Sequence, residues 1–269
     1  MKRLLLSLFT VLLLTVGTAW ADTFDDGYVA YMRGDYAEAV KWYRLAVAQG
    51  DARAQSNLGT MYYDGKGVTQ NYVEAVKWTR LAAAQGNARA QNNLGTMYSD
   101  GKGVTQNYVE AVKWYRLAAA QGNAGAQLDL GTKYGNGKGV TQNYAEAMKW
   151  YRLAATQGDA SAQFLIGTMY DIGQGVTQDY AEAVKWFRLA AAQGYASAQN
   201  NLGAMYYDGQ GVTQDYIRAH MWFNLSAASG DANAVKNRDI VARKMTSQQM
   251  AQAQMMARDC QQKNFKGCE

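Results

Sequence analysis

The chain has 269 residues, a formal net charge of +5 and 48% hydrophobic residues, many of them alanine. Such a high content of hydrophobic residues excludes an intrinsically disordered chain. The basic residues recur singly and never in blocks, so nothing indicates that the chain binds nucleic acid. Length alone would predict one or two globular domains, but the internal repeat described below overrides that expectation.

Residues 1–21 have the pattern of a secretory signal peptide. Lys2 and Arg3 precede an apolar run over residues 4–16, and Ala19-Trp20-Ala21 follows as an A-x-A cleavage site. The alternative, a membrane anchor, needs about 20 apolar residues and would have no cleavage site. We therefore expect cleavage after Ala21 and an exported chain, periplasmic or secreted, with no membrane span once the signal is removed.

A 36-residue period runs along almost all of the remaining chain. A tryptophan, a tyrosine and a glycine each recur six times at this spacing, the tryptophans at Trp42, Trp78, Trp114, Trp150, Trp186 and Trp222. An unbroken period of about 20–50 residues is typical of a stacked repeat array. Such an array grows by adding units and has no single closed core.

Each copy contains two predicted helices, here named helix A and helix B. Helix A of the second copy starts at Asp51, a preferred N-cap residue. Its residues Gln55, Leu58, Gly59 and Tyr62 have the i, i+3, i+4, i+7 spacing of one helix face. Glycine weakens a helix interior by about 1 kcal/mol against alanine, so its recurrence indicates that a neighbouring helix approaches the backbone there.

Helix B follows a loop with two glycines, which suit a positive φ. It begins at Asn71, and Glu74 three residues later makes an N-x-x-E variant of the capping box. We expect Trp78 and Leu81 to pack along one stripe of this helix together with its alanines. Glycine Gly86 ends it as a C-cap.

These features predict an all-α fold, an α/α solenoid of helix-turn-helix repeats. We divide the chain into the signal peptide 1–21, an N-terminal opening unit 22–50, repeats over 51–232, and a C-terminal capping helix and tail over 233–269. The cap is expected because the pattern dissolves after Gly230, and terminal repeats need a polar outer face. A helix over Ser247–Arg258 is predicted there.

The repeat resembles a known family. Its pattern is A-x-x-x-L-G-x-x-Y-x-x-G-x-G-V followed by D/N-Y-x-E-A-x-K-W-Y/F-R-x-A-A-x-Q-G, which is similar to the Sel1-like repeat, a relative of the tetratricopeptide repeat. The plain tetratricopeptide repeat has a period of about 34 and a proline, whereas this chain has a period of 36 and no proline. The resemblance implies a superhelix that docks other proteins or peptides on its concave face.

Catalytic residues are not indicated by the sequence. His220 is the one histidine, and no second histidine, cysteine or G-x-S-x-G sequence supports it. The glycine loops lack the spacing of a phosphate loop and the oxygen ligands of a calcium loop. We therefore expect no enzymatic activity, no cofactor, no metal and a monomer. A cell-wall or β-lactam-binding hydrolase is the alternative from another class.

The two cysteines, Cys260 and Cys268, both lie in the C-terminal tail. In an exported protein such a pair can close a disulfide, which we expect to staple the tail and to contribute little to the repeats. The pair could also be metal ligands, although no histidine or further cysteine is near.

Candidate binding residues emerge when the copies are compared with one another. Positions needed for stacking recur, so the helix A positions that differ are free to contact a partner. They predict the floor of a groove on the concave face. This floor is polar and basic in the first copies and apolar at Leu128, Phe164 and Leu165. Drift of solvent-facing residues would give the same variability, and exposed tyrosines such as Tyr63 and Tyr207 would also suit a carbohydrate-binding module. The candidate residues are Arg53, Asn57, Tyr63, Arg89, Asn93, Leu128, Asp129, Lys133, Phe164, Leu165, Asn201 and Tyr207.

Overall fold

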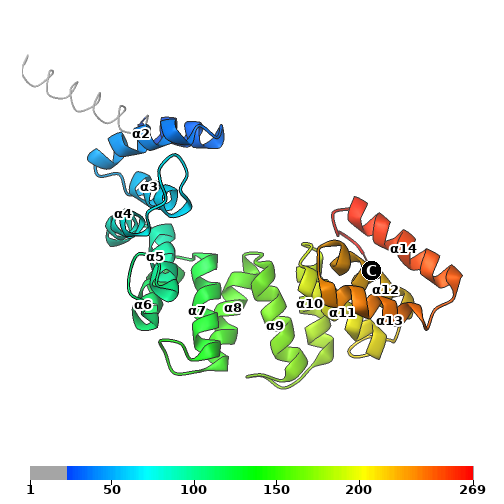
Figure 1. The fold of residues 1–269 in the computed structure, drawn as a ribbon. Coiled ribbons are helices and arrows are strands. Elements are labelled where there is room, and N and C mark those ends of the chain that lie inside the picture. The colour runs from blue at the N-terminus through cyan, green and yellow to red at the C-terminus, as the bar shows by residue number, and fades with distance from the viewer. Residues whose placement is uncertain (1–22, 269) are drawn as a thin grey trace, which may run out of the picture. The chain divides into compact units, whose positions relative to one another are not determined.

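The computed structural model describes residues 23–268, so the predicted signal peptide lies outside the described residues. Within this range every regular element is a helix (Figure 1). Residues 23–32 are the first helix A, and the later A helices are α3 (Ala52–Asp64), α5 (Ala88–Asp100), α7 (Ala124–Asn136), α9 (Ala160–Ile172), α11 (Ala196–Asp208) and α13 (Ala232–Ala242). The B helices are α2 (Tyr36–Ala48), α4 (Tyr72–Ala84), α6 (Tyr108–Ala120), α8 (Tyr144–Thr156), α10 (Tyr180–Ala191) and α12 (Tyr216–Ala228). The predicted all-α solenoid fold is confirmed.

The chain forms two compact bodies. The N-terminal body runs to Ala126 and includes Lys138–Val140, and the C-terminal body consists of Gln127–Gly137 and the chain from Thr141 onward. In each body a helix A packs against the helix B that follows it, as α3 does on α4 and α9 on α10. Among the described residues, no helix is both long and apolar enough to cross a membrane.

The recurring glycine of helix A lies where helix B crosses it. A Cβ on Gly95 would be 2.7 Å from the Tyr115 ring, and one on Gly131 would be 2.6 Å from the Tyr151 ring. Both tyrosines are buried. The predicted close approach is therefore confirmed: in these copies an aromatic ring of helix B fills the space that the glycine leaves, and at Gly59 the smaller Thr79 side chain occupies it.

Glutamines join helix A of a copy to the C-terminal end of its own helix B through side-chain hydrogen bonds. Gln85 donates to Gln55 over 2.8 Å in the N-terminal body, and Gln157 donates to Gln127 over 2.8 Å in the C-terminal body. The accepting glutamines are buried at helix A positions. A buried amide costs free energy unless it is hydrogen-bonded, so this pairing explains why glutamine recurs at these positions.

The helix B cap differs from the expected capping box. Asn71 accepts hydrogen bonds from the backbone N–H groups of Val73 and Glu74, as an N-cap residue should. The Glu74 carboxylate, however, pairs with Lys77 at 3.3 Å. Only one half of the box is present because the glutamate forms an i,i+3 ion pair along the helix surface.

The recurring leucine of helix B is exposed, so the sequence-based expectation that it packs is wrong. Leu81 is 45% exposed and Leu189 is 50% exposed. They lie on the outer side of helix B, away from the alanines that face helix A. In the last copy the equivalent Leu225 is fully buried.

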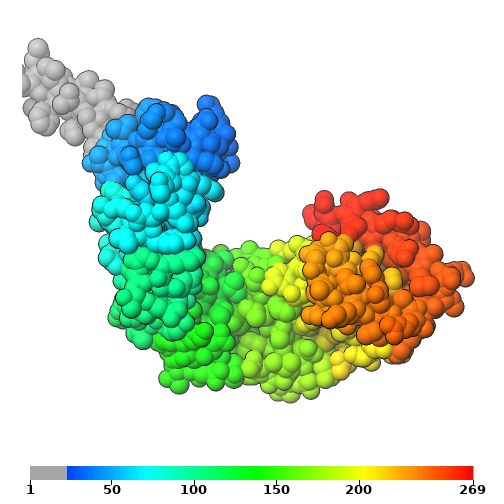
Figure 2. Space-filling view, viewed as in Figure 1, coloured from blue at the N-terminus to red at the C-terminus, as the bar shows by residue number. Residues whose placement is uncertain are grey.

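The C-terminal cap explains this difference. α14 (Ser247–Gln262) packs on α12 at the C-terminal end of the chain (Figures 1 and 2). Met221 takes the place that a lysine has in earlier copies, and it is buried together with Trp222 and Leu225. These three positions form one stripe of α12. The stripe is covered here, and Met221 replaces the solvated lysine that the earlier B helices carry.

The tail is part of the core rather than a loose extension. α14 continues to Gln262, beyond the predicted end at Arg258, and a disulfide joins Cys260 to Cys268 with a Cα–Cα distance of 5.2 Å. Both cysteines are buried in the same hydrophobic cluster as Phe223 and Leu225. The tail therefore packs on the last repeat, and how much the disulfide contributes to the stability of that repeat is a question for measurement.

We expect loss of this disulfide to lower the free energy of unfolding by about 2–3 kcal/mol, because the closed loop is short and chain entropy sets the scale. The measurement is urea unfolding of the oxidised protein, of the same protein with a reductant, and of the double variant C260S/C268S. The reduced protein and the double variant should agree. Unchanged unfolding in both would show that the tail does not support the last repeat.

Candidate functional site

The candidate residues of the N-terminal body line three neighbouring hollows along its A helices. The largest, of about 400 Å³, lies between residues 23–32, α3 and α5, and its lining includes Phe24, Tyr28, Arg53, Asn57 and Arg89. A second hollow, of about 240 Å³, is lined by Tyr63, Arg89 and Asn93, with Thr60, Asp64, Thr96 and Met97.

A third and smaller hollow lies beside the other two. Its lining includes Asn57, Thr60 and Arg89, together with Tyr28, Tyr31 and Tyr43. Arg89 therefore borders all three hollows. Burial raises the pKa of the Tyr43 hydroxyl, against smaller opposing effects of Asn57 and Arg89, so the Tyr43 hydroxyl stays protonated at neutral pH.

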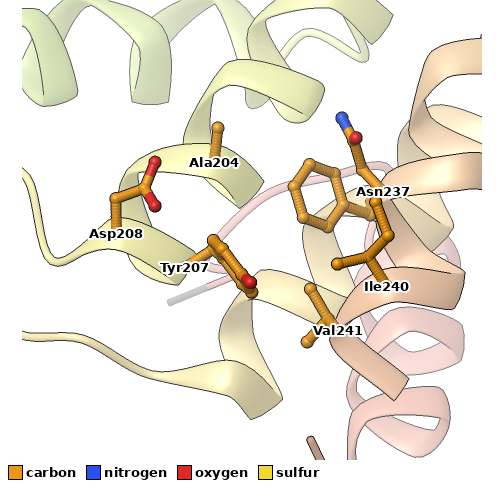
Figure 3. Close-up of a pocket in the computed structure, with 7 residues that line it drawn as sticks. Ala204, Tyr207, Asp208, Asn237, Ile240 and Val241 are labelled. Carbon is orange, nitrogen blue, oxygen red and sulfur yellow. The ribbon is translucent and has the colours of Figure 1, made fainter. Parts of the chain in front are cut away.

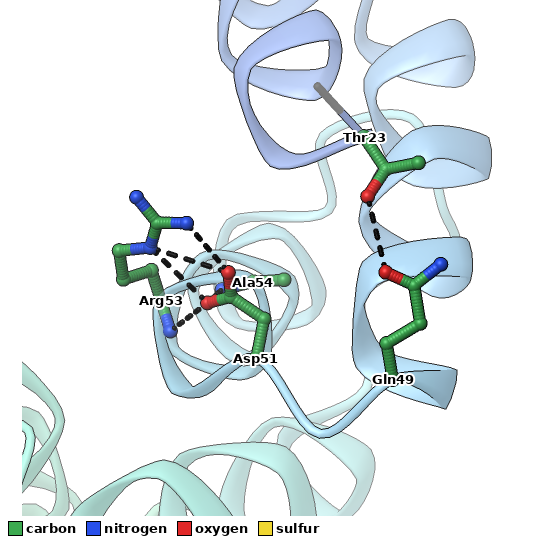
Figure 4. Close-up of polar contacts among 5 residues, drawn as sticks. All are labelled: Thr23, Gln49, Asp51, Arg53 and Ala54. Atoms are coloured by element: carbon green, nitrogen blue, oxygen red, sulfur yellow. Dashed lines mark hydrogen bonds and ion pairs between the residues drawn. The ribbon is translucent and has the colours of Figure 1, made fainter. Parts of the chain in front are cut away.

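Arg53 is held in place by its own helix cap. Asp51, the N-cap residue of α3, accepts from the backbone N–H groups of Arg53 and Ala54 and from the Arg53 guanidinium at 2.7 Å (Figure 4). The same guanidinium lies 4.1 Å from the centre of the Phe24 ring. An ion pair and a cation–π contact thus already satisfy Arg53.

The Asp51 carboxylate makes this cap sensitive to pH. Burial by itself raises the pKa of Asp51, but hydrogen bonds from the Arg53 side chain and from the two backbone N–H groups outweigh it, so the pKa lies below its ordinary value. A lowered folded-state pKa stabilises the protein above the unfolded pKa, and this stabilisation is lost as the pH falls through the folded pKa.

We expect Asp51→Asn to lower the free energy of unfolding by roughly 0.5 kcal/mol at pH 7, because asparagine still caps the helix and the half-exposed ion pair is screened by solvent. The difference from the unmodified protein should shrink as the pH falls through the lowered pKa of Asp51, because the protonated carboxyl group is then neutral like the amide. The check is urea unfolding at pH 7 and over a series of acidic pH values. A difference that persists at low pH would assign the effect to geometry instead of charge.

Tyr63 is engaged by neighbouring side chains. Its hydroxyl accepts a hydrogen bond from Lys102 over 2.7 Å, and its ring meets the Tyr72 ring edge-on with 5.2 Å between centroids. The equivalent Tyr207 in the C-terminal body has the same surroundings, with Tyr216 at 5.6 Å between centroids and the Lys244 ammonium 4.4 Å from the ring centre. Neither ring therefore presents a free stacking face on that side.

The three apolar candidates of the C-terminal body contribute to its core. Leu128 and Leu165 are partly buried against the cluster that contains Tyr151 and Ile166. Phe164 contacts the Phe187 and Tyr195 rings, with centroids 5.7 and 5.2 Å away. Comparison between the copies singled out these three residues because they vary. In the structure, however, they pack against neighbouring core residues.

The remaining candidates lie on α7 and α11. Asp129 and Lys133 are half-buried one turn apart on α7, and Asn201 is half-buried on α11. Tyr207 lines a hollow of about 180 Å³ between α11 and α13, opposite Ile240 and Val241 (Figure 3). In this hollow a candidate residue of the C-terminal body borders an apolar recess together with residues of α13.

Several lining residues escaped the sequence comparison. Phe24 and Tyr28 belong to the first helix, where the repeat pattern is weakest, and Thr60 and Thr96 recur, so that variation between copies could not single them out. The cap residues Asp51 and Asn87 did differ between copies, and that signal was available. The sequence does not show, however, that the Asp51 carboxylate contacts the guanidinium of Arg53.

The arrangement suits binding more than bond chemistry. His220 is buried in the last repeat, and residues 23–268 contain no group of three or more His, Cys, Asp or Glu side chains that could hold a metal. The hollows of the N-terminal body offer amides, hydroxyls, aromatic rings and the guanidinium groups of Arg53 and Arg89, which are the groups that recognise a peptide.

Comparison with known proteins gives a consistent picture. The family model described as Sel1 repeat matches six consecutive segments, 23–51, 52–87, 88–123, 124–159, 160–195 and 196–231. A solved Sel1 repeat protein from Oxalobacter formigenes is 39% identical over 81% of this chain and 86% of that chain, with a TM-score of 0.76. One from Klebsiella pneumoniae subsp. pneumoniae is 24% identical over 76% of this chain and 99% of that chain, with a TM-score of 0.50, which supports the fold alone. No curated protein matches.

Proposed function

Because the chain belongs to the Sel1-repeat family, we propose that it is an exported, non-catalytic scaffold that captures a protein or peptide on its A-helix surface. Sel1 repeats typically mediate protein interactions. The export step rests on the signal-peptide pattern of residues 1–21, and periplasmic and secreted destinations both remain open.

One observation carries the proposal. The candidate residues of α3 and α5 all line three adjoining hollows of the N-terminal body: Arg53, Asn57, Tyr63, Arg89 and Asn93. Concave sites with a few polar groups and aromatic walls are where proteins bind ligands.

The two alternative functions receive less support. A hydrolase would need a nucleophile next to a base, and the one histidine is buried in the last repeat. A carbohydrate platform would need open aromatic faces, whereas Tyr63 and Tyr207 are each packed by a lysine and a second tyrosine.

Site-specific photocrosslinking in the producing cell tests the capture surface. A benzophenone amino acid at Asn93, on the wall of the second hollow, should give discrete adducts in the exported fraction. The matched control carries the same group at Leu81, which is exposed on the outer side of α4 in the same body. Equal adducts from both positions would contradict capture on the A helices.

Two simpler measurements test the rest of the proposal. The mass of the exported protein tests cleavage after Ala21. Hydrolysis of nitrocefin by that protein would favour the hydrolase instead.

A further inference from the structure

Arg53 and Arg89 occupy the same position in successive copies but differ in their surroundings. Arg53 follows the cap residue Asp51, whose carboxylate binds its guanidinium at 2.7 Å. Arg89 follows Asn87, which caps α5 through the Ala90 N–H and carries no charge. Within the described part of the chain, no carboxylate oxygen forms an ion pair with Arg89.

The contact that Arg89 does make is weak. Its Nη1 donates to the Asn57 side-chain oxygen over 3.4 Å, near the upper limit for a hydrogen bond. The other carboxylates that line these hollows do not pair with Arg89. Asp64 pairs with Lys66 at 3.7 Å, and Asp25, which lines the largest hollow, forms no ion pair with Arg89. The Arg89 guanidinium therefore borders three hollows without an ion-pair partner in the described chain.

We infer that Arg89 is a carboxylate-binding position, and that it receives an Asp or Glu side chain within an extended segment of the captured protein. The inference rests on the proposed function. A planar guanidinium matches a carboxylate in two parallel hydrogen bonds, and Arg53 shows this pairing inside the same protein.

The position of Arg89 favours an internal acidic residue over a chain terminus. Hollows lie on both sides of it, toward Phe24 and Tyr28 and toward Tyr63 and Asn93. A segment that places its carboxylate on Arg89 can therefore continue in both directions. Asparagine and threonine side chains along this path can pair with the backbone of an extended peptide. Near Arg89, the buried Ser56 hydroxyl also has no hydrogen-bond partner in the described chain.

The test is selection of a phage-displayed random heptapeptide library on the full exported protein. The displayed peptides have no free C-terminus, so any acidic preference comes from side chains. We expect Asp or Glu to be enriched at one position. A selected peptide and its Glu→Gln or Asp→Asn version are then measured by fluorescence anisotropy, and the amide version should bind about 10-fold more weakly.

Variants of the protein separate charge from structure. Arg89→Gln should weaken the acidic peptide about 10-fold and leave the amide peptide unchanged, whereas Arg53→Gln should have a small effect on both because Arg53 is already paired. Asn87→Asp is the sharpest variant: it retains a cap residue and the arginine, but it gives Arg89 the same internal partner that Arg53 has. It should weaken the acidic peptide about 10-fold without lowering the melting temperature.

The outcomes distinguish the two proposals. Selected peptides with no acidic preference, or an acidic preference unaffected by Arg89→Gln and Asn87→Asp, would overturn the carboxylate position while leaving peptide capture intact. Tighter binding of a peptide whose only carboxylate is its C-terminus would overturn the internal acidic residue. If the library yields no binding peptide, the carboxylate position falls, and photocrosslinking at Asn93 still decides the proposed function independently.

Discussion

Replacing Gly103 by alanine should lower the free energy of unfolding by about 3–4 kcal/mol, through two effects that add. Gly103 has a φ of +73°, which L side chains rarely adopt, and a Cβ there would lie 2.2 Å from the Tyr72 carbonyl oxygen. The obstacle is backbone at the start of α4, so no side-chain rotation can relieve it. The loop after α5 and the first turn of α4 would have to separate.

Gly122 supplies the matched control. Its φ is +84°, and a Cβ there would meet nothing within 4 Å. Gly122→Ala should therefore lower the free energy of unfolding by the conformational penalty alone, about 1–2 kcal/mol. Urea unfolding followed by tryptophan fluorescence measures both variants. Equal losses would mean that the loop does not pack on α4 as closely as the structure has it.

Leu225→Ala should lower the free energy of unfolding by about 3 kcal/mol, within the range for a fully buried leucine. The same substitution at Leu189, one repeat earlier in the same body and 50% exposed, should lower it by less than about 1 kcal/mol. Both leucines recur at one position of helix B. The difference between them measures what α14 contributes by covering α12.

Truncation of the cap provides a further check on this pair. A chain that ends before Ser247 lacks α14, so Leu225 should then become exposed, and Leu225→Ala should have an effect close to that of Leu189→Ala. A large effect that persists without α14 would assign the burial of Leu225 to α13 instead. Thermal unfolding of the four proteins compares the two leucines with and without the cap.

The fold was largely predictable from the sequence because its local signals agree. Asp51 and Asn71 cap helices as expected, and the helix A glycine meets an aromatic ring of helix B. Recurrence misled at one position, Leu81, because duplication copies exposed residues as faithfully as buried ones. Telling the two apart requires knowing which side of helix B faces helix A, and the alanines on both sides leave that undecided.

The candidate site was less predictable, for a geometric reason. Variation between copies found Arg53 and Arg89 but treated them alike, and it placed Phe164 beside them although that ring packs on Phe187. Whether such an arginine forms an ion pair depends on whether the side chain of the N-cap residue, two positions earlier, carries a carboxylate that reaches its guanidinium. The difference between Asp51 and Asn87 is visible in the sequence, but only the three-dimensional arrangement gives it a meaning.

The packing of α14 on α12 also restricts which repeats of this protein can be duplicated in evolution. Copies up to α10 carry a lysine on the outer side of helix B, paired with a glutamate as Lys185 is with Glu182. Any of them can therefore be duplicated without uncovering residues that are buried in the existing chain. The copy that contains Met221 cannot, because its duplicate would present the covered stripe to water. Unequal recombination can therefore add or remove 36-residue segments upstream of Asp215, while the last segment and its cap are inherited together.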